Sequence, residues 1–436
     1  MGTPIAFVIH PELRNAPSSR PADLMLEEAC LLARAIGLKI MHGEVIALTK
    51  LRAGSYFGKG VTERLANLAE NFTHEIGAPV VIVNTSLSPV QQRNLEKQIK
   101  TKVIDRTQLI LEIFGARAQT HAGRLQVELA ALSFQRSRLV RSWTHLERQR
   151  GGNGFLGGPG ERQIELDRRM LMERVTRIKG ELKEVTRTRT LQRSNRLRSG
   201  TLTVALIGYT NAGKSTLFNK LTGADVLSKD MLFATLDPTM RELDFDSGRK
   251  AVLADTVGFI SQLPTELVEA FKSTLEEVVN ADVLLHVHDA SSPLVVEEAA
   301  DVIKVLGDLG MDAETHEARI LHVLNKADLL DNDDEQVARL QNMFPNGVFA
   351  SAVTGEGLDD LLGYLDRHLG KSAILVIIDI TPTDGAVRAW LYQNAMVKSS
   401  NSDDLGHERI LVSIDPADHA RLCSRWPNLG VCLAKL

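Results

Sequence analysis

The sequence predicts a multidomain α/β protein, and three observations support this. Over residues 1–115, apolar strand-like segments alternate with helical patterns, which predicts an N-terminal domain with a parallel sheet. Residues 116–198 contain two long runs in which apolar side chains recur alternately every three and four positions, which predicts a long antiparallel helical hairpin. Residues 199–370 begin with a strand and a glycine-rich phosphate-loop motif, and residues 371–436 predict a small C-terminal α/β domain. A chain of 436 residues is long enough for each of these parts to have its own core.

The composition excludes several classes of protein. Hydrophobic residues make up 44% and charged residues 24% of the chain, as in ordinary soluble globular proteins. No apolar run approaches the roughly 18 residues of a membrane span, and no leader pattern is visible, so we expect a cytoplasmic protein without a stable membrane anchor. The cysteines are widely spaced and odd in number, which argues against a disulfide framework or a metal site. We expect reduced, structural thiols at Cys30, Cys423 and Cys432.

In the N-terminal domain, predicted strands and helices alternate along the chain. The strands are expected at residues 5–9, 44–48, 80–83 and 103–104, and the helices at residues 21–36, 61–72 and 89–99. The turn at residues 55–60 contains two glycines and Lys59 and precedes a helix. It is therefore either a cradle for a phosphate or a plain tight turn.

The two arms of the hairpin are defined by apolar or long side chains. At about 1.5 Å per residue each arm would run roughly 40–50 Å, so the hairpin is expected to project from the globular body. Between residues 187 and 200 the pattern decays, which predicts a basic linker. The recurring positions are Leu125, Leu129, Leu132, Arg136, Leu139, Trp143 and Leu146 in the first arm, and Ile164, Arg168, Leu171, Val175, Ile178, Leu182 and Val185 in the second.

The hairpin is strongly basic, and its tip is rich in glycine. Residues 136–198 contain 17 Lys and Arg against 7 Asp and Glu, in a chain whose net charge is −4. Such a block is either a footprint for nucleic acid or a solvated helix face. The tip, from Gly151 to Gly160, would let the backbone approach RNA closely, or it would only connect the arms. The flanking arginines are Arg148, Arg150, Arg162, Arg168 and Arg169.

The segment GYTNAGKS follows the apolar strand at residues 202–207 and precedes a helix-compatible run. In such a loop, backbone N–H groups surround the phosphates, Lys214 reaches the β- and γ-phosphate oxygens, and the Ser215 hydroxyl holds Mg²⁺. The dipole of the following helix favours the negative charge. The nucleotide-binding residues expected here are Gly208, Tyr209, Thr210, Asn211, Ala212, Gly213, Lys214, Ser215 and Thr216.

Two later motifs indicate which nucleotide is bound. The strand at residues 251–254 ends in Asp255, which can reach Mg²⁺ through water, and the N–H of Gly258 can sense a γ-phosphate. The motif NKAD follows another strand, and its Asp328 can accept hydrogen bonds from N1–H and the 2-amino group of guanine, which adenine lacks. Together these motifs predict a P-loop GTPase domain that binds GTP and GDP. The other residues expected at the site are Thr256, Val257, Asn325, which can brace the loops, Lys326, whose stem can cover the base, and Ser351 and Ala352, which can reach guanine O6.

The chain resembles the HflX-type GTPases, a bacterial, ribosome-associated family related to translation factors. The resemblance implies that Phe233, Ala234 and Thr235 belong to the nucleotide site and that Thr235 holds Mg²⁺ beside Ser215. Lys214, Thr235 and Gly258 are then the expected catalytic residues. The resemblance covers essentially the whole chain and rests on DRTQLI at 105–110, LQVEL at 125–129, GGPGERQ at 157–163, DRR at 167–169, GYTNAGKST at 208–216 and FATLDPT at 233–239.

The resemblance also implies partners. Members of the family bind the 50S ribosomal subunit, with the hairpin reaching 23S rRNA and the C-terminal domain facing ribosomal proteins or rRNA. They split or rescue stalled ribosomes under stress, and we expect the same of this chain as a monomer. An ATP site in the N-terminal domain is implied as well, although Val61 stands where many members carry Lys.

Two positions bear on the rate of GTP hydrolysis. Phe259 stands where Ras-like enzymes have the Gln that orients the attacking water, so slow intrinsic hydrolysis stimulated by the ribosome is expected. Asn211 matches the asparagine that coordinates K⁺ in related potassium-activated GTPases. Its alternative role is to brace the loop.

In the C-terminal domain we expect strands at residues 373–380 and 409–414, helices at 384–397 and 416–426, and a polar loop at 398–407. For the whole chain, a ribosome-splitting GTPase is favoured. A large-subunit assembly or RNA-remodelling factor and a GTP-gated rRNA-binding module are the alternatives.

Overall fold

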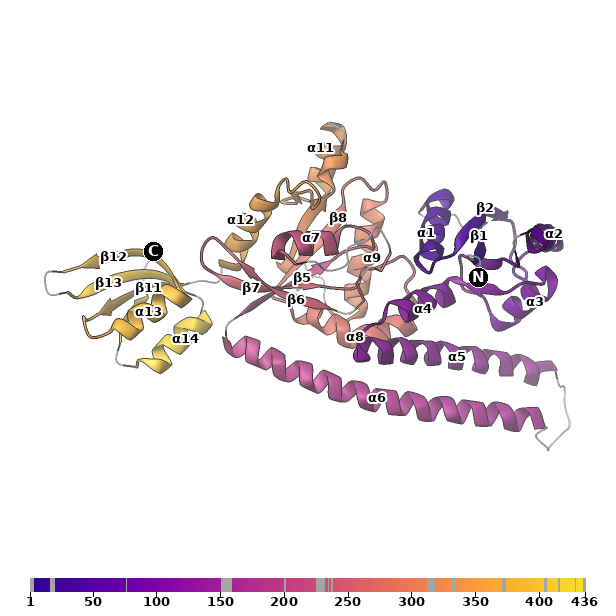
Figure 1. The fold of residues 1–436 in the computed structure, drawn as a ribbon, viewed down its shortest axis with the longest axis horizontal. Helices are drawn as coiled ribbons and strands as arrows, with labels where there is room; N and C mark the ends of the chain where they lie inside the picture. The colour runs from indigo at the N-terminus through magenta and orange to yellow at the C-terminus, as the bar shows by residue number, and fades with distance from the viewer. Residues whose placement is uncertain are drawn as a thin grey trace.

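Three sheets are set along one long axis, with the N-terminal domain at one end and the C-terminal domain at the other (Figure 1). This computed structural model confirms the predicted multidomain α/β class, while the exact domain boundaries stay a prediction. The structure describes residues 4–15, 20–75, 77–149, 159–199, 201–224, 232–233, 235–236, 238–311, 318–330, 334–370, 374–403, 406–414, 416–427 and 429–433.

The N-terminal sheet is wholly parallel, as predicted, with the strand order β2-β1-β3-β4. Helices cover both of its faces, so the middle strands are continuous apolar runs. One element was not predicted: a helix begins directly after the last strand, where the Asp105 carboxylate caps it by accepting from the N–H of Gln108. The elements are β1 (Ile5–Leu13), α1 (Ala22–Ala35), β2 (Lys39–Leu48), α2 (Lys59–Glu75), β3 (Val80–Val83), α3 (Pro89–Ile99), β4 (Val103–Asp105) and α4 (Arg106–Arg117).

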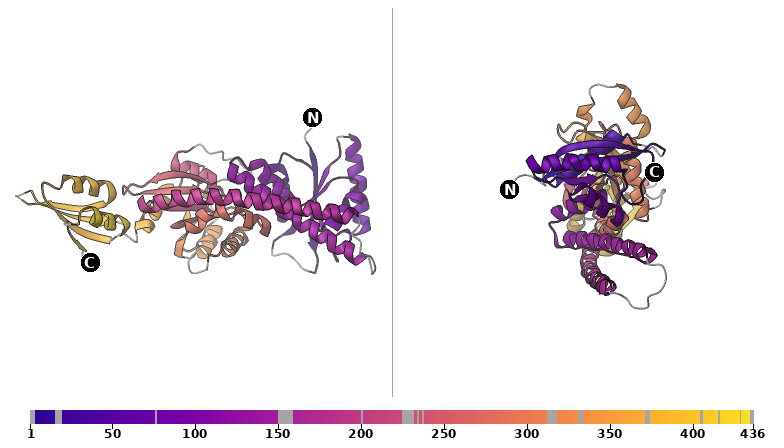
Figure 2. Two further views of the ribbon diagram at one scale, coloured as in Figure 1. Left: turned by 90° about the horizontal axis from the view of Figure 1, so that it is seen from below. Right: turned by 90° about the vertical axis from the view of Figure 1, so that its right-hand side faces the viewer.

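The predicted antiparallel hairpin is formed by α5 (His121–Gln149) and α6 (Pro159–Ser199). Two expectations were wrong. The basic segment expected as a linker is helical as far as Ser199, which makes α6 a helix of 41 residues. The hairpin also lies along the body instead of projecting from it, because α5 packs against α4 and α8 (Thr265–Asn280) (Figures 1 and 2). Residues 150–158, which include most of the glycine-rich tip, and the side chains of Arg148 and Arg162 lie outside the described residues.

The central sheet has the order β10-β9-β8-β5-β7-β6, and only the edge strand β6 runs antiparallel to its neighbour. The carboxyl ends of its parallel strands therefore meet at one edge, the usual place for a ligand in an open α/β sheet. The strands are β5 (Leu202–Ile207), β6 (Thr239–Asp244), β7 (Lys250–Asp255), β8 (Val283–Asp289), β9 (Ile320–Asn325) and β10 (Val348–Phe349). The remaining helices are α7 (Lys214–Thr222), α9 (Val295–Asp308), η1 (Ala327–Leu329), α11 (Asp334–Met343) and α12 (Leu358–Leu369).

The C-terminal sheet is antiparallel, with the order β12-β13-β11-β14. Two predictions were wrong here: residues 396–397, expected to end a helix, and residues 398–402, expected to form a loop, belong to one strand. Their backbone pairs with β13 at the edge of the sheet. The last strand was not predicted. The elements are β11 (Ile374–Ile380), α13 (Gly385–Asn394), β12 (Met396–Ser402), β13 (Glu408–Ile414), α14 (Pro416–Arg425) and β14 (Gly430–Leu433).

The largest core is shared by the N-terminal domain, the hairpin and the GTPase domain. At its centre the ring of Phe114 from α4 lies 4.6 Å from the ring of Phe233 and 4.9 Å from that of Phe271, centroid to centroid. Ile178 of α6 is fully buried in the same core. Because burial of apolar surface is the dominant stabilising term, these three parts are held together as one packed unit.

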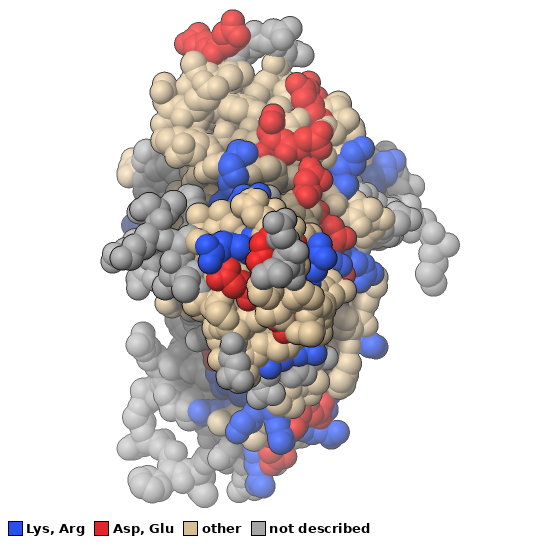
Figure 3. Space-filling model, turned by 90° about the vertical axis from the view of Figure 1, so that its left-hand side faces the viewer, with Lys and Arg blue, Asp and Glu red and all other residues tan. Residues whose placement is uncertain are grey.

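No helix among the described residues is both long and apolar enough to cross a membrane. Seen from the end that carries the C-terminal domain, Lys and Arg predominate low on the molecule, where the hairpin lies, and Asp and Glu predominate higher up (Figure 3). Cys30 and Cys423 are free thiols, as expected.

Candidate nucleotide-binding site

At the carboxyl edge of the central sheet lies a cavity of about 430 Å³. The structure gathers most of the predicted site residues around it, from segments far apart in the sequence. Those that line it are Thr210, Asn211, Gly213, Lys214, Ser215, Thr216, Phe233, Thr235, Thr256, Gly258, Asn325, Lys326, Asp328 and Ala352. Those not in its lining are Gly208, Tyr209, Ala212, Asp255, Val257 and Ser351, and Ala234 lies outside the described residues.

Two glycines of the phosphate loop are required by close packing. Gly208 has φ +146°, and a Cβ there would lie 2.2 Å from the carbonyl oxygen of Val287. Gly213, with φ +90°, forms the N-cap of α7, and a Cβ there would lie 2.1 Å from Nδ2 of Asn325. Both positions thus combine a left-handed backbone with no room for a side chain.

Replacing Gly208 with Ala should lower both the unfolding temperature and the affinity for GDP, because the new methyl group cannot avoid the Val287 carbonyl. Thermal unfolding and fluorescent GDP binding measure the two effects. Gly223→Ala is the matched control: its φ of +65° is also unfavourable, but nothing lies within 4 Å of its Cβ position. A Gly208 variant no worse than this control would show that the loop can shift freely.

The ammonium of Lys214 is turned onto the phosphate loop. Its Nζ donates to the carbonyl oxygen of Gly208 at 3.0 Å and to that of Tyr209 at 2.7 Å. Burial lowers the pKa of Lys214 to about 8, and the nearby Asp255 carboxylate opposes that shift. An anion in the cavity would stabilise the charged form further, since opposite charges raise the pKa of an amine.

Three oxygen-bearing side chains meet beside Lys214. Oδ2 of Asp255 accepts hydrogen bonds from Oγ of Ser215 and Oγ1 of Thr235, both at 2.7 Å, and the two hydroxyl oxygens are 2.8 Å apart. Oδ1 of Asp255 is buried without a hydrogen-bond partner. Burial raises the pKa of Asp255, while the two hydroxyl groups and Lys214 oppose the shift. Hydroxyl and carboxylate oxygens are ligands that Mg²⁺ prefers, so this donor set fits the metal expected here.

The guanine-recognition segment is fixed to the phosphate loop by Asn325. Its Nδ2 donates to the carbonyl oxygen of Ala212 at 2.8 Å, and its Oδ1 accepts from the N–H of Ala352 at 3.0 Å. This geometry is what a bracing role requires. Lys326 pairs with Asp289, the last residue of β8, through a contact of 2.6 Å between Nζ and Oδ2. Lys326 also lines the cavity.

Comparison with known proteins identifies the family. Residues 23–115 match the model described as GTP-binding GTPase N-terminal, residues 117–196 the GTP-binding GTPase middle region, residues 203–326 the 50S ribosome-binding GTPase and residues 336–429 the HflX C-terminal domain. The GTPase HflX of Magnetococcus marinus is 48% identical over 408 residues, which are 93% of this chain and 92% of that protein. The chain belongs to the HflX family of GTPases. It is a GTP hydrolase that binds GTP and GDP.

Other HflX relatives agree with this assignment. The GTPase HflX of Escherichia coli K12 is 45% identical over 353 residues, which are 81% of this chain and 82% of that protein. A solved GTP-binding protein from Sulfolobus solfataricus in complex with GDP is 21% identical, covers 84% of this chain and 98% of its own, and has a TM-score of 0.43. That likeness is too low to add to the assignment.

In this HflX-family protein, Phe259 lies against the phosphate loop but not in the cavity. Its N–H donates to the carbonyl oxygen of Gly208 at 3.1 Å, and its own carbonyl accepts from the N–H of Thr210 at 2.7 Å. The side chain is 1% exposed and belongs to the shared core. The ring is therefore buried outside the cavity, and it could not orient an attacking water by a hydrogen bond in any case.

Sequence reasoning missed two apolar residues at the cavity. Leu329 is 55% exposed and Val353 is 72% exposed, and both line the cavity. Each directly follows a predicted site residue, Asp328 and Ala352 respectively, and that adjacency was the only available signal. Exposed apolar side chains beside a base-recognition motif suit contact with a planar base.

Sequence reasoning also missed a buried network that connects the N-terminal domain to this HflX phosphate loop. The phenol oxygen of Tyr209 accepts from Nη1 of Arg20 at 3.1 Å and from the N–H of Ser261 at 2.7 Å, and it donates to Oε2 of Glu28 at 3.1 Å. Burial raises the pKa of Tyr209, so the phenol stays protonated. Nη2 of Arg106 donates to Oε1 of Glu28 at 2.5 Å and to Oγ of Ser261 at 3.0 Å. The N-terminal domain thus contacts both the phosphate loop and the segment that follows Gly258.

Proposed function

We propose that this HflX-family GTPase binds the 50S ribosomal subunit and splits or rescues stalled ribosomes. In this proposal its intrinsic GTP hydrolysis is slow and is stimulated by the ribosome. The observation that supports it most is the match of residues 203–326 to the 50S ribosome-binding GTPase model. The basic helical hairpin directly before that segment gives a surface suited to rRNA.

The proposed roles of the site residues follow from their positions. Lys214 meets the charge that develops on the β- and γ-phosphate oxygens, and the N–H of Gly258 contacts the γ-phosphate. Ser215 and Thr235 would hold Mg²⁺, and Asp255 would hold it through water. The bound metal would neutralise phosphate charge. The nearness of the three oxygen donors supports this assignment.

The proposed partners are 23S rRNA for the hairpin and ribosomal proteins or rRNA for the C-terminal domain. The tip from Gly151 to Gly160 and its flanking arginines are the segment proposed to reach the RNA. A monomer acting in the cytoplasm fits this role. An ATP site at residues 55–60 stays a prediction; Lys59 there is 90% exposed and forms a surface pair with Glu63.

The first test is GTP hydrolysis by the purified protein with and without 50S subunits. A large stimulation by 50S is expected, and an unchanged rate would contradict the proposal. Replacing Arg148, Arg150 and Arg162 with Ala should weaken 50S binding and flatten its salt dependence. A matched triple variant of exposed arginines elsewhere, at Arg52, Arg93 and Arg339, controls for lost charge.

Sedimentation separates the alternatives. Incubation of 70S ribosomes with the protein and GTP should yield separate subunits if the protein is a splitting factor. Binding to free 50S without any loss of 70S would favour an assembly or RNA-remodelling factor. Splitting that proceeds with a slowly hydrolysed GTP analogue would show that binding does the work and hydrolysis recycles the protein.

Replacing Na⁺ with K⁺ should accelerate GTP hydrolysis, because we propose that Asn211 helps to coordinate K⁺ beside the phosphates. Asn211 is exposed at the cavity and has a left-handed backbone with φ 63°. Hydrolysis is measured in the two salts at equal ionic strength, for the natural protein and for Asn211→Ala. Equal rates in both salts, with and without ribosomes, would leave Asn211 only the role of bracing the loop.

A further inference from the structure

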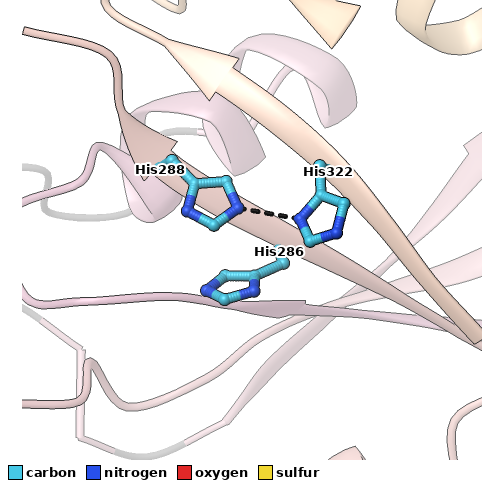
Figure 4. A group of neighbouring side chains, drawn as sticks. All are labelled: His286, His288 and His322. Carbon is cyan, nitrogen blue, oxygen red and sulfur yellow. Dashed lines mark hydrogen bonds between the residues drawn. The ribbon is translucent and has the colours of Figure 1, made fainter. Parts of the chain in front are cut away.

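Three histidines gather on the central sheet outside the nucleotide cavity. His286 and His288 are two positions apart on β8, so their side chains lie on the same face of the sheet. His322 lies directly opposite His286 on the neighbouring parallel strand β9. The period of the strands and their register therefore bring three imidazoles together, as Figure 4 shows.

The ring nitrogens are close enough to share one ion. One nitrogen from each ring lies within 4.8 Å of the other two. Nε2 of His288 and Nδ1 of His322 are joined by a hydrogen bond of 2.9 Å, drawn as the dashed line in Figure 4. Nδ1 of His286 is buried and has no hydrogen-bond partner. A buried polar atom without a partner is costly and calls for an explanation such as a missing ligand.

The surroundings suit neutral metal ligands. His286 is 1% exposed and His288 4% exposed, and the ring of Phe344 covers His288 with a centroid distance of 4.3 Å. Burial lowers the pKa of all three imidazoles, that of His288 to about 3. A neutral imidazole carries a lone pair on one of its two ring nitrogens, and that nitrogen is the one that binds a metal. His322 is only partly buried, whereas the other two histidines are buried.

We propose that His286, His288 and His322 bind a transition-metal cation of the zinc class, which joins β8 to β9. Imidazole is a preferred ligand of zinc, and three histidines with a water molecule complete a tetrahedral site. Among the described residues, this is the one group of three His, Cys, Asp or Glu side chains compact enough for an ion. Binding would replace the bond between His288 and His322 and give a ring nitrogen of the buried His286 a partner.

A metal at this site would help to fix the positions of the guanine-recognition residues, because these residues lie at or next to the ends of the same two strands. Strand β8 ends at Asp289, which pairs with Lys326, and β9 ends at Asn325, which braces the phosphate loop. A metal that joins the two strands would hold these two ends in register. It is distinct from the Mg²⁺ expected at Ser215, because its ligands are nitrogens and not oxygens.

Titration with Co²⁺, which absorbs visible light strongly in a tetrahedral site, tests the proposal on the full chain without an affinity tag. Excess Mg²⁺ is present so that Co²⁺ does not occupy the oxygen site. We expect one Co²⁺ per chain and its displacement by Zn²⁺. X-ray absorption of the Zn²⁺ form should show nitrogen ligands at about 2.0–2.1 Å.

Variants assign the site. His322→Gln and His288→Gln should each weaken Co²⁺ binding by about 100-fold or more, since each removes a ligand. His121→Gln, an exposed histidine at the start of α5, is the matched control and should bind Co²⁺ normally. GDP binding confirms that each variant is folded. Absence of the tetrahedral absorption in the natural protein, or its persistence in both variants, would overturn the proposal.

Discussion

Replacing Asp328 with Asn should turn the nucleotide preference from guanine to xanthine. The carboxylate of Asp328 lines the cavity and is expected to accept from N1–H and the 2-amino group of guanine. An amide presents a donor where one of these acceptors stood, and xanthine carries an oxygen at position 2 that can accept from it. GTP affinity should fall by about 10³-fold or more, on the scale by which hydrogen-bonding sites reject a mismatched analogue.

Competition of GTP and XTP against a fluorescent nucleotide measures this change. Asp334→Asn, an exposed aspartate at the start of α11, is the matched control and should leave both affinities unchanged. If the Asp328 variant lost affinity for GTP without gaining affinity for XTP, the substitution would have damaged the site without changing its base preference. If it kept GTP, Asp328 would not read the base.

Replacing Arg106 with Ala should destabilise the protein by about 3–5 kcal/mol, the usual cost of removing one partner of a buried ion pair. Arg106 is 3% exposed, and its guanidinium donates to Glu28, to Oδ1 of Asn84 at 2.7 Å and to the carbonyl oxygen of Ser261 at 2.9 Å. Its removal takes the closest positive charge from Glu28, which keeps hydrogen bonds from Tyr209 and Ser261, and it takes a donor from the carbonyl oxygen of Ser261. Urea unfolding measures the loss.

The matched control is Arg64→Ala, which removes a guanidinium bonded to Glu44 at 2.9 Å but 51% exposed. That surface pair should be worth about 1 kcal/mol or less. Equal losses in the two variants would mean that the connection through Arg106 adds nothing to the interface. GDP dissociation should also be faster in the Arg106 variant, since Ser261 and Tyr209 belong to the same network.

Much of the fold could be predicted because it repeats a short-range pattern. The parallel strands and the two arms of the hairpin follow directly from the spacing of apolar side chains. The spacing of apolar side chains did not predict the structure of segments that pack against nothing or on one side only. Residues 187–199 are helical without an apolar stripe, and residues 398–402 are polar because their strand lies at the edge of a sheet.

The candidate site could be predicted where function restricts a local motif. Lys214, Ser215 and Asp328 lie in short segments whose chemistry depends on their spacing, and all three line the cavity. Contacts between distant segments gave no such signal. The bond between Arg20 and Tyr209 spans 189 positions along the chain, and the histidine cluster depends on which strands are neighbours and on their register.

The shared core has a consequence for work with fragments of this chain. Leu267, Phe271 and Leu275 on α8 are buried in the core that also contains residues of α4 and α5. A fragment beginning after residue 199 would expose that face of α8 to water, and exposed apolar patches of this kind promote association. The GTPase domain carries its own nucleotide-binding residues, but one apolar face of it is kept from water by the two segments that precede it.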